Sequence, residues 1–413
     1  MTDTTAHRNE PAGAAAVHQG VKDYYGKILS QTSDLKSNAC VPSAKPIPTY
    51  IRKALAEVHP DVTARYYGCG LVVPECLEGC RLLDLGCGSG RDCYMLSQLV
   101  GENGHITGVD MTENQLEVAR KFIDYHMQKF GFKKPNVNFV QGYIEALREA
   151  GLEEKSYDVV ISNCVLNLSP DKASVLQEAY HVLKDGGELY FSDIYSNARI
   201  SESLRANKVL WGECLSGALW WEDFLRLAAE VGFSVPRLVT ASIVSVGNEE
   251  LQRLLGDYKF VSATYRLFKL PKNWEKKRCL VMYDGNITGS EEKLEFDAQY
   301  TFKVNEVMEV DGDVASILKN SRFSEEFTFH SQASTACCAK PKVMPVNPFE
   351  LVEQLGSSDV LSSTGGCCGP QESCCMPNQN VCQCSGCLQV WADNLHPGIQ
   401  SAWNELSLWH NLQ

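Results

Sequence analysis

The chain has 413 residues, a formal net charge of −13 and 18 cysteines. The length predicts two domains with tails, and the negative charge disfavours nucleic-acid partners, whose phosphates are neutralised by lysine and arginine. Residues 1–20 lack the basic start and apolar core of a signal peptide, and no apolar run approaches the roughly 20 residues of a membrane-spanning helix. We therefore expect a soluble, cytosolic protein without a membrane partner. Its cysteines are then expected to act as ligands or redox groups rather than as a disulfide framework.

The first half of the chain is predicted to alternate between strands and helices. Residues 1–20 are expected to be disordered, and residues 21–35 have the apolar spacing of a helix. A proline-rich loop at 40–48 and a short helix at 48–58 follow. Strands are then predicted at 81–85, 105–110, 137–141, 157–163 and 188–193, and helices at 91–100, 113–130, 172–183 and in a short segment ending at 150. This order indicates an α/β fold, a doubly wound parallel sheet with helices on both faces.

The pattern changes in the second half. A helical stretch near 203–227 and strands at 238–246 and 260–270 predict an antiparallel edge to the sheet. Alternating apolar and polar residues at 279–283, 293–300 and 307–310 predict a small β-rich domain. From about residue 331 the chain is rich in Ser, Gly, Pro, Gln and Cys, which predicts a largely disordered tail with a short helix near 402–409. The predicted divisions are therefore 1–47, 48–271, 272–331 and 332–413.

A glycine turn after the first predicted strand indicates a nucleotide cofactor. Gly86, Gly88 and Gly90 let the backbone turn sharply and approach a ligand at the start of the next helix. Asp110 follows Gly90 by 20 residues, where doubly wound folds place the carboxylate that binds a ribose. With Asp84 ahead of the turn, the pattern Asp-x-Gly-x-Gly-x-Gly resembles the fingerprint of S-adenosylmethionine methyltransferases.

Four cysteines lie in segments that are expected to surround the mouth of this cofactor site. Cys164 follows the strand 157–163, at the sheet edge where open α/β folds bind ligands. Cys69 lies between two glycines, Cys214 lies in the helical stretch after the fifth strand, and Cys40 lies in the proline-rich loop, a candidate lid. Thiolates select soft centres such as trivalent arsenic. Arsenic attacks with a lone pair and needs no general base, which fits a site without an acid–base pair.

At these residues the chain resembles the animal-type arsenite methyltransferases, over about residues 21–329. The segments that carry the resemblance are RYYGCG at 65–70, DLGCGSGRD at 84–92, SNCVLNL at 162–168, ELYFSD at 188–193, KVLWGECL at 208–215 and FVSATYRLFK at 260–269. The resemblance implies a Rossmann-like methyltransferase fold, with S-adenosylmethionine as methyl donor. It also implies arsenite and methylarsenicals as substrates, and glutathione or thioredoxin as reductant. We expect a monomer.

The resemblance also implies roles for individual residues. Cys164 and Cys214 are expected to hold arsenic next to the methyl group, with Cys69 as a third ligand. Cys40 is expected to act as a resolving thiol that can pair with Cys69. Together with the glycine-turn pattern, it predicts a set of cofactor contacts: Tyr67, Asp84, Gly86, Gly88, Gly90, Asp110, Met111, Ile144, Glu145 and Asn163.

Two other readings remain open at this point. One is a methyltransferase of a small organic acceptor such as a quinone precursor, in which the cysteines are incidental. The other is a non-catalytic thiol protein that sequesters arsenite or a metal. The tail cysteines 367, 368, 374, 375, 382, 384 and 387 either capture arsenic or zinc or belong to an extension without a role. Cys76, Cys80, Cys93 and Cys279 are interpreted as structural, and Cys87 as packing beside the glycine turn.

Overall fold

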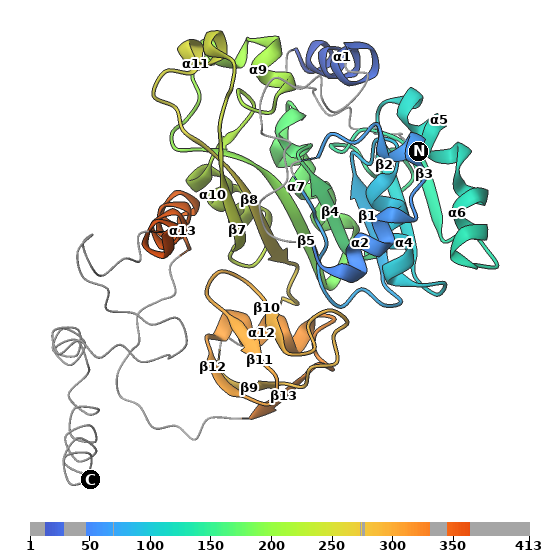
Figure 1. The fold of residues 1–413 in the computed structure, drawn as a ribbon, viewed down its shortest axis with the longest axis vertical. Coiled ribbons are helices and arrows are strands. Elements are labelled where there is room, and N and C mark those ends of the chain that lie inside the picture. Colours follow the sequence, from blue (N-terminus) through green and yellow to red (C-terminus); the bar gives the residue numbers. More distant parts are fainter. Residues whose placement is uncertain are drawn as a thin grey trace, which may run out of the picture. The chain divides into compact units, whose positions relative to one another are not determined.

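The computed structural model describes residues 13–28, 47–68, 70–272, 274, 277–330 and 345–363 (Figure 1). Within these residues, no helix is long and apolar enough to cross a bilayer. Contacts divide the chain into two units, Met1–Leu355 and Gly356–Gln413. The elements that we describe in detail all lie in the first unit, apart from the end of the last helix.

The larger part of the first unit is built on an eight-stranded sheet in the order β3-β2-β1-β4-β5-β8-β7, with the short strand β6 paired to β5. Strands β1 to β5 run parallel, whereas β8 is antiparallel to β5 and β7 is antiparallel to β8. The strands are β1 (Arg81–Leu85), β2 (His105–Asp110), β3 (Val137–Gln141), β4 (Tyr157–Asn163), β5 (Leu183–Ser196), β6 (Leu219–Trp220), β7 (Arg237–Val244) and β8 (Phe260–Phe268). The predicted parallel sheet with an antiparallel edge is confirmed.

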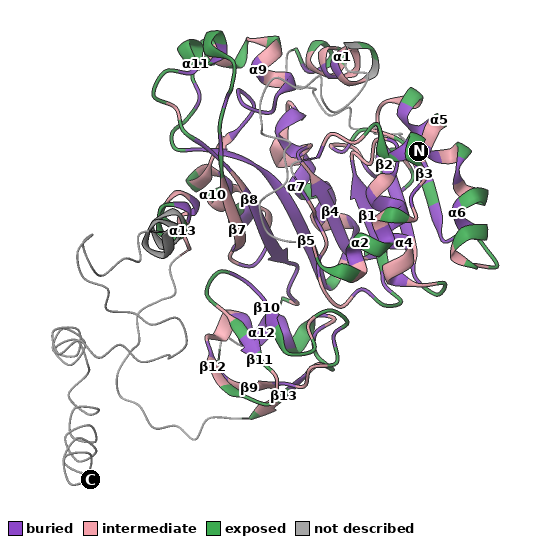
Figure 2. Ribbon diagram, viewed as in Figure 1, coloured by how far each residue is buried: buried purple, intermediate pink, exposed green. Residues whose placement is uncertain are grey.

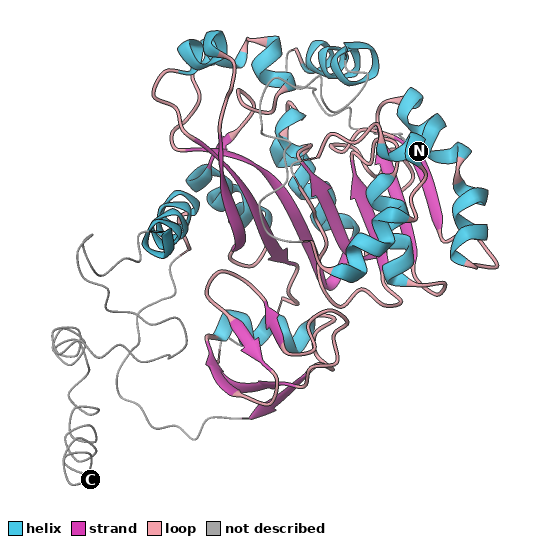
Figure 3. Ribbon diagram, in the orientation of Figure 1, coloured by secondary structure: helices cyan, strands magenta, loops and turns pink. Residues whose placement is uncertain are grey.

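Helices cover both faces of this sheet, as Figure 3 shows. The helices of this part of the chain are α1 (Ala14–Asp23), α2 (Thr49–Ala56), α3 (Pro60–Thr63), α4 (Arg91–Val100), α5 (Glu113–Lys121), α6 (Ile123–Phe130), α7 (Lys172–Val182), α8 (Glu202–Arg205), α9 (Lys208–Gly212), α10 (Trp221–Val231) and α11 (Glu249–Leu255). A π-helical turn, η1 (Tyr24–Ile28), continues α1, and a 3-10 turn, η3 (Leu166–Leu168), follows β4.

Neighbouring residues of the strands supply two separate cores. Side chains alternate along a strand, so Leu82 packs with α2 and α4 on one face while Leu83 packs with α7 and α10 on the other. In the same way, Val159 faces the first core and Val160 the second. Figure 2 shows the resulting buried strands. Strands buried on both faces explain the continuous apolar runs in the sequence.

Residues 277–330 form a smaller β-rich part with its own core. It has a sheet in the order β12-β9-β13 and a two-stranded sheet of β10 and β11. Its elements are β9 (Cys279–Tyr283), β10 (Lys293–Glu295), β11 (Thr301–Lys303), β12 (Val307–Val310), α12 (Gly312–Asn320) and β13 (Phe327–His330). Phe296, Phe302 and Phe323 are buried at its centre. The predicted β-rich domain is confirmed, although α12, β11 and β13 were not predicted.

Buried ion pairs connect the large sheet to this smaller part. Arg266 on β8 pairs with Glu188 on β5 at 2.6 Å and donates a hydrogen bond to the Phe296 carbonyl oxygen at 2.8 Å. Arg322 reaches the second oxygen of Glu188 at 2.6 Å. Removal of one partner would leave a buried charge without compensation, so these pairs fix the two parts against each other.

Several local predictions were wrong. Residues 14–20, expected to be disordered, belong to α1, and the helix predicted at 113–130 is divided at Phe122. Residues 143–151 form turns instead of a short helix, because Gly142 and Gly151 flank them and successive turn hydrogen bonds replace a helical ladder. Helices α11 and α13 (Pro348–Ser363) were not predicted. The division of the chain at residues 48, 272 and 332 stays a prediction.

Candidate active site

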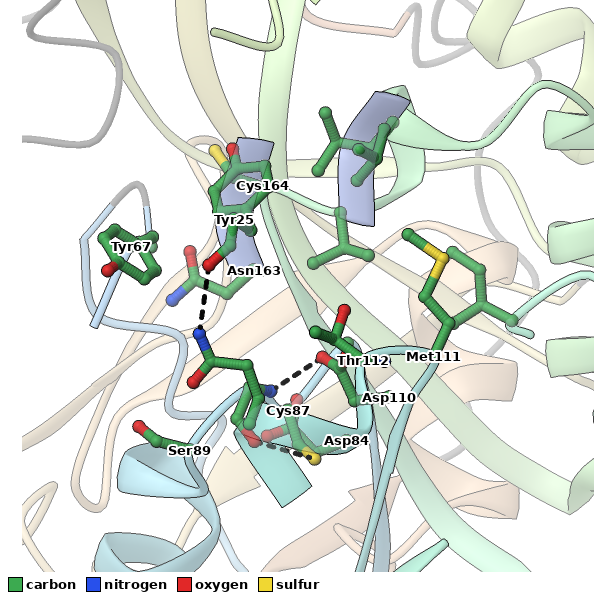
Figure 4. Close-up of a pocket in the computed structure, with 18 of the residues that line it drawn as sticks. Tyr25, Tyr67, Asp84, Cys87, Ser89, Asp110, Met111, Thr112, Asn163 and Cys164 are labelled. Carbon is green, nitrogen blue, oxygen red and sulfur yellow. Dashed lines mark hydrogen bonds between the residues drawn. The ribbon is translucent and has the colours of Figure 1, made fainter. Parts of the chain in front are cut away.

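A cavity opens at the carboxyl ends of β1, β2 and β4 (Figure 4). Its walls come from six segments of the sequence: the α1 and η1 region, residues 65–68, the glycine turn, the end of β2, residues 142–145 and residues 163–169. Parallel sheets bind ligands at this edge. The cavity is therefore the candidate cofactor site.

The glycine turn is shaped by backbone geometry that other residues would not adopt. Gly86 has φ of +71°, and an added Cβ would lie 2.5 Å from a methyl carbon of Val165. Gly88 has φ of +53° with open space where a side chain would extend. The turn therefore leaves a cradle at the start of α4 in which a ligand can approach the backbone.

Asp110 holds the glycine turn in place. One oxygen of its carboxylate accepts a hydrogen bond from the Gly88 amide at 2.9 Å, and the other accepts from the Thr112 amide at 2.8 Å. Burial raises the pKa of Asp110, against the lowering effect of these backbone donors. A carboxylate has about four acceptor positions, so capacity remains for a ligand hydroxyl. The sequence predicted contact with the ligand and did not predict the bond to Gly88.

Asp84 is a second carboxylate at the cavity, buried at the end of β1. The Cys93 thiol donates to it at 3.2 Å. Burial, and then the neighbouring Asp92, raise the pKa of Asp84 to about 7. Its charge therefore changes near neutral pH.

Asn163 joins the end of β4 to the loop before β1. Its side-chain amide donates to the Tyr66 hydroxyl at 2.7 Å and to the Gly70 carbonyl oxygen at 3.0 Å. This places residues 65–68, including Tyr67, along the cavity wall. Figure 4 shows Tyr67 and Asn163 near the strand end that carries Cys164.

The N-terminal helix forms a wall that was missed in the sequence. His18 Nε2 lies 3.2 Å from Glu145 Oε1, and Ser169 also donates to that carboxylate. Burial acts to raise the pKa of Glu145, but the hydrogen bonds from His18 and Ser169 outweigh it and lower the pKa. The signal for this wall was the apolar spacing that begins near Val21, which continues backward into α1.

Cys164 and Cys214, 50 residues apart in sequence, are brought together. Both are buried, and the Cys214 thiol donates to the Cys164 carbonyl oxygen at 3.3 Å. Both have left-handed backbones, with φ of +58° and +60°. Such values are uncommon for residues other than glycine and gather at functional sites. Cys164 also lines the cavity, and it is disulfide-bonded.

The predicted cysteines thus divide into two groups. Cys164 and Cys214 lie together beside the cavity, whereas Cys40 and Cys69 lie outside the described residues. The other described cysteines, at 76, 80, 87, 93 and 279, are thiols. Burial raises the pKa of Cys76 to about 12 and that of Cys87 to about 11, which disfavours reactive thiolates. In the described part of the chain, no group of three or more His, Cys, Asp or Glu side chains gathers in a way that would hold a metal ion.

Of the ten predicted cofactor residues, nine line the cavity: Tyr67, Asp84, Gly86, Gly88, Asp110, Met111, Ile144, Glu145 and Asn163. Gly90 does not. It precedes α4 as its N-cap, with φ of +84°, and an added Cβ would lie 2.8 Å from the ring of Phe139. Its predicted contact with the cofactor stays a prediction. The lining residues that sequence reasoning missed include His18, Val21, Tyr25, Tyr66, Thr112, Gln115 and Tyr143.

Lys172 begins α7, contacts Ser169 of the cavity wall and interacts electrostatically with Cys214. Its ammonium donates to the Ser169 carbonyl oxygen at 2.9 Å and lies 5.1 Å from the ring centroid of Trp211. Burial lowers the pKa of Lys172 to about 8. A positive charge at this place favours thiolate over thiol in its surroundings.

Comparisons with known proteins agree with this geometry. A family model described as a methyltransferase domain matches residues 77–232, and one described as the arsenite methyltransferase C-terminal domain matches residues 276–375. The chain is 56% identical to the arsenite methyltransferase of Rattus norvegicus and 54% identical to that of Homo sapiens, in each case over 87% of this chain and 98% of the relative. Among solved structures, an arsenic(III) S-adenosylmethionine methyltransferase from Chlamydomonas reinhardtii is 45% identical, with a TM-score of 0.67, over 70% of this chain and 98% of that one.

Proposed function

This chain belongs to the arsenite methyltransferase family, and we propose that it transfers methyl groups from S-adenosylmethionine to trivalent arsenic, yielding mono- and dimethylated products. The observation that carries this proposal is the pairing of Cys164 and Cys214 beside the glycine-turn cavity, where the Cys214 thiol lies 3.3 Å from the Cys164 carbonyl oxygen. The pairing puts soft ligands next to a cofactor site, as a thiophilic substrate requires.

The cavity has features that fit S-adenosylmethionine. The open cradle at Gly88 admits a ligand against the backbone, and Asp110 keeps acceptor capacity for ribose hydroxyls. The rings of Tyr25 and Tyr67, whose centroids are 5.5 Å apart, lie at the cavity wall and can stabilise a cation. When bound, S-adenosylmethionine supplies an electrophilic methyl group carried on a positively charged sulfur.

The proposed work of the protein is to hold the acceptor. Cys164 and Cys214 bind arsenic and leave its lone pair available, with Cys69 as a third ligand for arsenite. Alignment of this kind lowers the activation free energy of such transfers by roughly 7–11 kcal/mol. Because arsenic attacks through its lone pair, the proposal requires no side chain to remove a proton from the acceptor. The methyl–sulfur bond breaks as the methyl–arsenic bond forms, which releases S-adenosylhomocysteine and formally oxidises arsenic from As(III) to As(V). Two electrons from thiols must therefore return arsenic to As(III) before a second transfer, with a disulfide as the oxidised product.

The disulfide at Cys164 supports the proposal of a thiol reductant. A sulfur bonded to another sulfur does not serve as a thiolate ligand, so Cys164 must be reduced before it binds arsenic. Reduction takes two electrons and two protons, which a thiol or dithiol supplies by exchange. We propose glutathione or thioredoxin for this role. The monomeric state and the cytosolic location expected from the sequence stay predictions.

A methyl-transfer assay tests the proposed function against the two other readings. Reduced protein is mixed with S-adenosylmethionine labelled in its methyl group, with and without arsenite, and the arsenicals are separated. We expect label in methylated arsenicals only when arsenite is present. Arsenite binding without transfer would favour a sequestering protein. Label in an organic acceptor with no dependence on arsenite would favour the other methyltransferase reading.

A second assay separates the proposed thiols by step. Monomethylarsonous acid has two positions left for thiols, whereas arsenite has three. Cys69→Ser and Cys40→Ser should therefore lose the first methylation and keep much of the second. Equal loss of both steps would contradict this division of roles.

A further inference from the structure

The turn that carries Cys214 is short and has an unusual backbone. It leaves the five-residue helix α9, which Asn207 begins by accepting hydrogen bonds from the amides of Val209 and Leu210. The Cys214 amide then donates to the Trp211 carbonyl oxygen at 3.0 Å, with Cys214 itself in the left-handed conformation. A non-glycine residue persists in this conformation only where its surroundings hold it. Contacts from outside the turn must therefore hold Cys214 in this conformation.

Two tyrosines of the N-terminal segment contact this turn directly. The Tyr24 hydroxyl donates to Glu213 Oε1 at 2.6 Å, and the Tyr25 hydroxyl donates to the Gly212 carbonyl oxygen at 2.8 Å. Gly212 leaves room for this contact, because an added Cβ would lie 2.9 Å from the ring of Tyr24. The tyrosines are thus fitted to the residues immediately before Cys214.

The hydrogen bond between Tyr24 and Glu213 is buried, so water does not readily replace the tyrosine as a donor to the carboxylate. Glu213 has 1% of its surface exposed and Tyr24 has 7%. A buried carboxylate needs donors, since burial without them is costly. If the phenol hydroxyl were removed, Glu213 would move toward another donor, and the neighbouring Cys214 would move with it.

The same segment forms part of the cofactor cavity. His18, Val21 and Tyr25 line the cavity. The segment is held there by the contact of His18 with Glu145 and by the hydrogen bond from the Lys22 ammonium to the Tyr143 hydroxyl at 2.9 Å. Figure 4 shows Tyr25 among the residues around the cavity, together with Cys164. One segment thus reaches both the cofactor wall and the arsenic-side turn.

We infer that Tyr24 is a positioning residue of the arsenic site, which sets the Cys214 sulfur relative to Cys164 through Glu213. The inference rests on the proposed function, because it assumes that these two sulfurs bind arsenic. The new element is the N-terminal segment. It supplies no arsenic ligand in the proposed function, but it supports the acceptor site. Tyr24 acts through Glu213 and does not itself touch the substrate.

The test is Tyr24→Phe, which removes one hydroxyl and keeps the ring against Gly212. Calorimetric titration of the reduced, full-length protein with arsenite alone should give about tenfold weaker binding, since a hydrogen bond to a charged group is lost. Titration with S-adenosylmethionine should change less than about twofold. The KM for arsenite should rise more than kcat falls.

A double variant and a matched control separate positioning from general damage. In Tyr24→Phe with Glu213→Gln, a neutral amide tolerates the missing donor better than a carboxylate, so arsenite affinity should partly return. Tyr94→Phe removes another buried tyrosine hydroxyl, which donates to the Ala119 carbonyl oxygen in a different core from that of Cys214, and should leave arsenite affinity unchanged.

The outcomes are distinct. If wild-type protein neither binds nor methylates arsenite, the proposed function fails first. If wild-type protein binds arsenite and Tyr24→Phe binds it equally well, the inference is wrong. It is also wrong if Tyr24→Phe weakens arsenite and S-adenosylmethionine binding equally and the double variant restores neither.

Discussion

The two sides of the candidate site are built in different ways. On the cofactor side, the glycine turn lies in one continuous stretch, from Asp84 to Thr112, and the hydrogen bonds that hold the turn close within that stretch. The acceptor side joins Cys164, Cys214 and the N-terminal tyrosines, which come from three segments far apart in the chain. Local sequence therefore determines the first side, while the second depends on packing between distant segments.

The strongest test of this contrast is Cys214→Ser. Serine keeps the shape of the side chain but gives a hard oxygen in place of a soft sulfur. We expect arsenite methylation to fall at least about 10³-fold, as when an essential catalytic group is lost, with binding of S-adenosylmethionine unchanged. The measurements are product formation from arsenite and calorimetry with the cofactor.

Cys279→Ser provides the matched control. Cys279 is also a buried thiol, and it donates to the His330 carbonyl oxygen at 3.3 Å, the same distance as the bond from Cys214 to Cys164. It lies in the smaller β-rich part, so its loss should leave methylation intact. Equal damage by the two substitutions would mean that Cys214 acts in packing and not in binding arsenic.

The sequence indicated most of the predicted cofactor residues that line the cavity because the signals of the glycine turn are local. Glycine residues at fixed spacing, with Asp84 before and Asp110 after them, reveal a turn without knowledge of the rest of the fold. Gly90 was grouped with the cavity glycines for the same reason, because spacing alone does not distinguish a glycine that faces a ligand from one that packs on Phe139. The parallel sheet was predicted for a similar reason, since strands buried on both faces are continuously apolar.

The acceptor side was predicted only as a set of cysteines. The association of Cys164 with Cys214 followed from a family resemblance, and no local pattern joins residues 50 positions apart. Helix α1 was missed because its small and polar residues resemble a disordered end, and its apolar stripe becomes informative only when it packs on the cavity. Helix α13 was missed for the same reason, because the surrounding tail is polar.

Helix α13 provides a second test of whether segments far apart in the sequence stabilise each other. Val352 is buried in the core that contains Phe224 and Leu238, and Val346 and Phe349 pack against it. A chain that ends at residue 344 loses these contacts and should be less stable by about 2–4 kcal/mol, the value of burying one or two large apolar side chains. A chain that ends at Ser363 retains them.

Thermal unfolding of the two shortened chains and the full chain measures this effect. We expect the chain ending at 363 to match the full chain and the chain ending at 344 to unfold at a lower temperature. Equal unfolding temperatures for the two shortened chains would show that α13 is dispensable for the core.

On the cofactor side, Asp110→Ala should weaken S-adenosylmethionine binding by roughly tenfold to a hundredfold, because hydrogen bonds to a charged group are lost at Gly88 and Thr112. Arsenite binding by the reduced protein should be unchanged, since these contacts do not involve the acceptor side. Asp158→Ala is the control: Asp158 also accepts from a backbone amide, that of Arg81 at 2.9 Å, but at the opposite end of β1. If both variants weaken cofactor binding alike, the effect belongs to the sheet and not to the turn.

The smallest expected effect concerns the charge of Asp84. Burial and the nearby Asp92 raise its pKa to about 7 in the folded protein, whereas an unfolded aspartate titrates near about 4. Between these values the folded state holds a proton that the unfolded state has released, so stability falls as pH rises from about 4 to about 7. Asp84→Asn cannot ionise and should lack this decline, so its stability relative to the wild type should rise by about 1–2 kcal/mol between pH 5 and pH 6.5. Urea unfolding of both proteins at the two pH values measures the difference. A decline of the same size in the variant would show that Asp84 is ionised throughout this range. The buried carboxylate of Asp84 would then not lower the stability of the protein as pH rises.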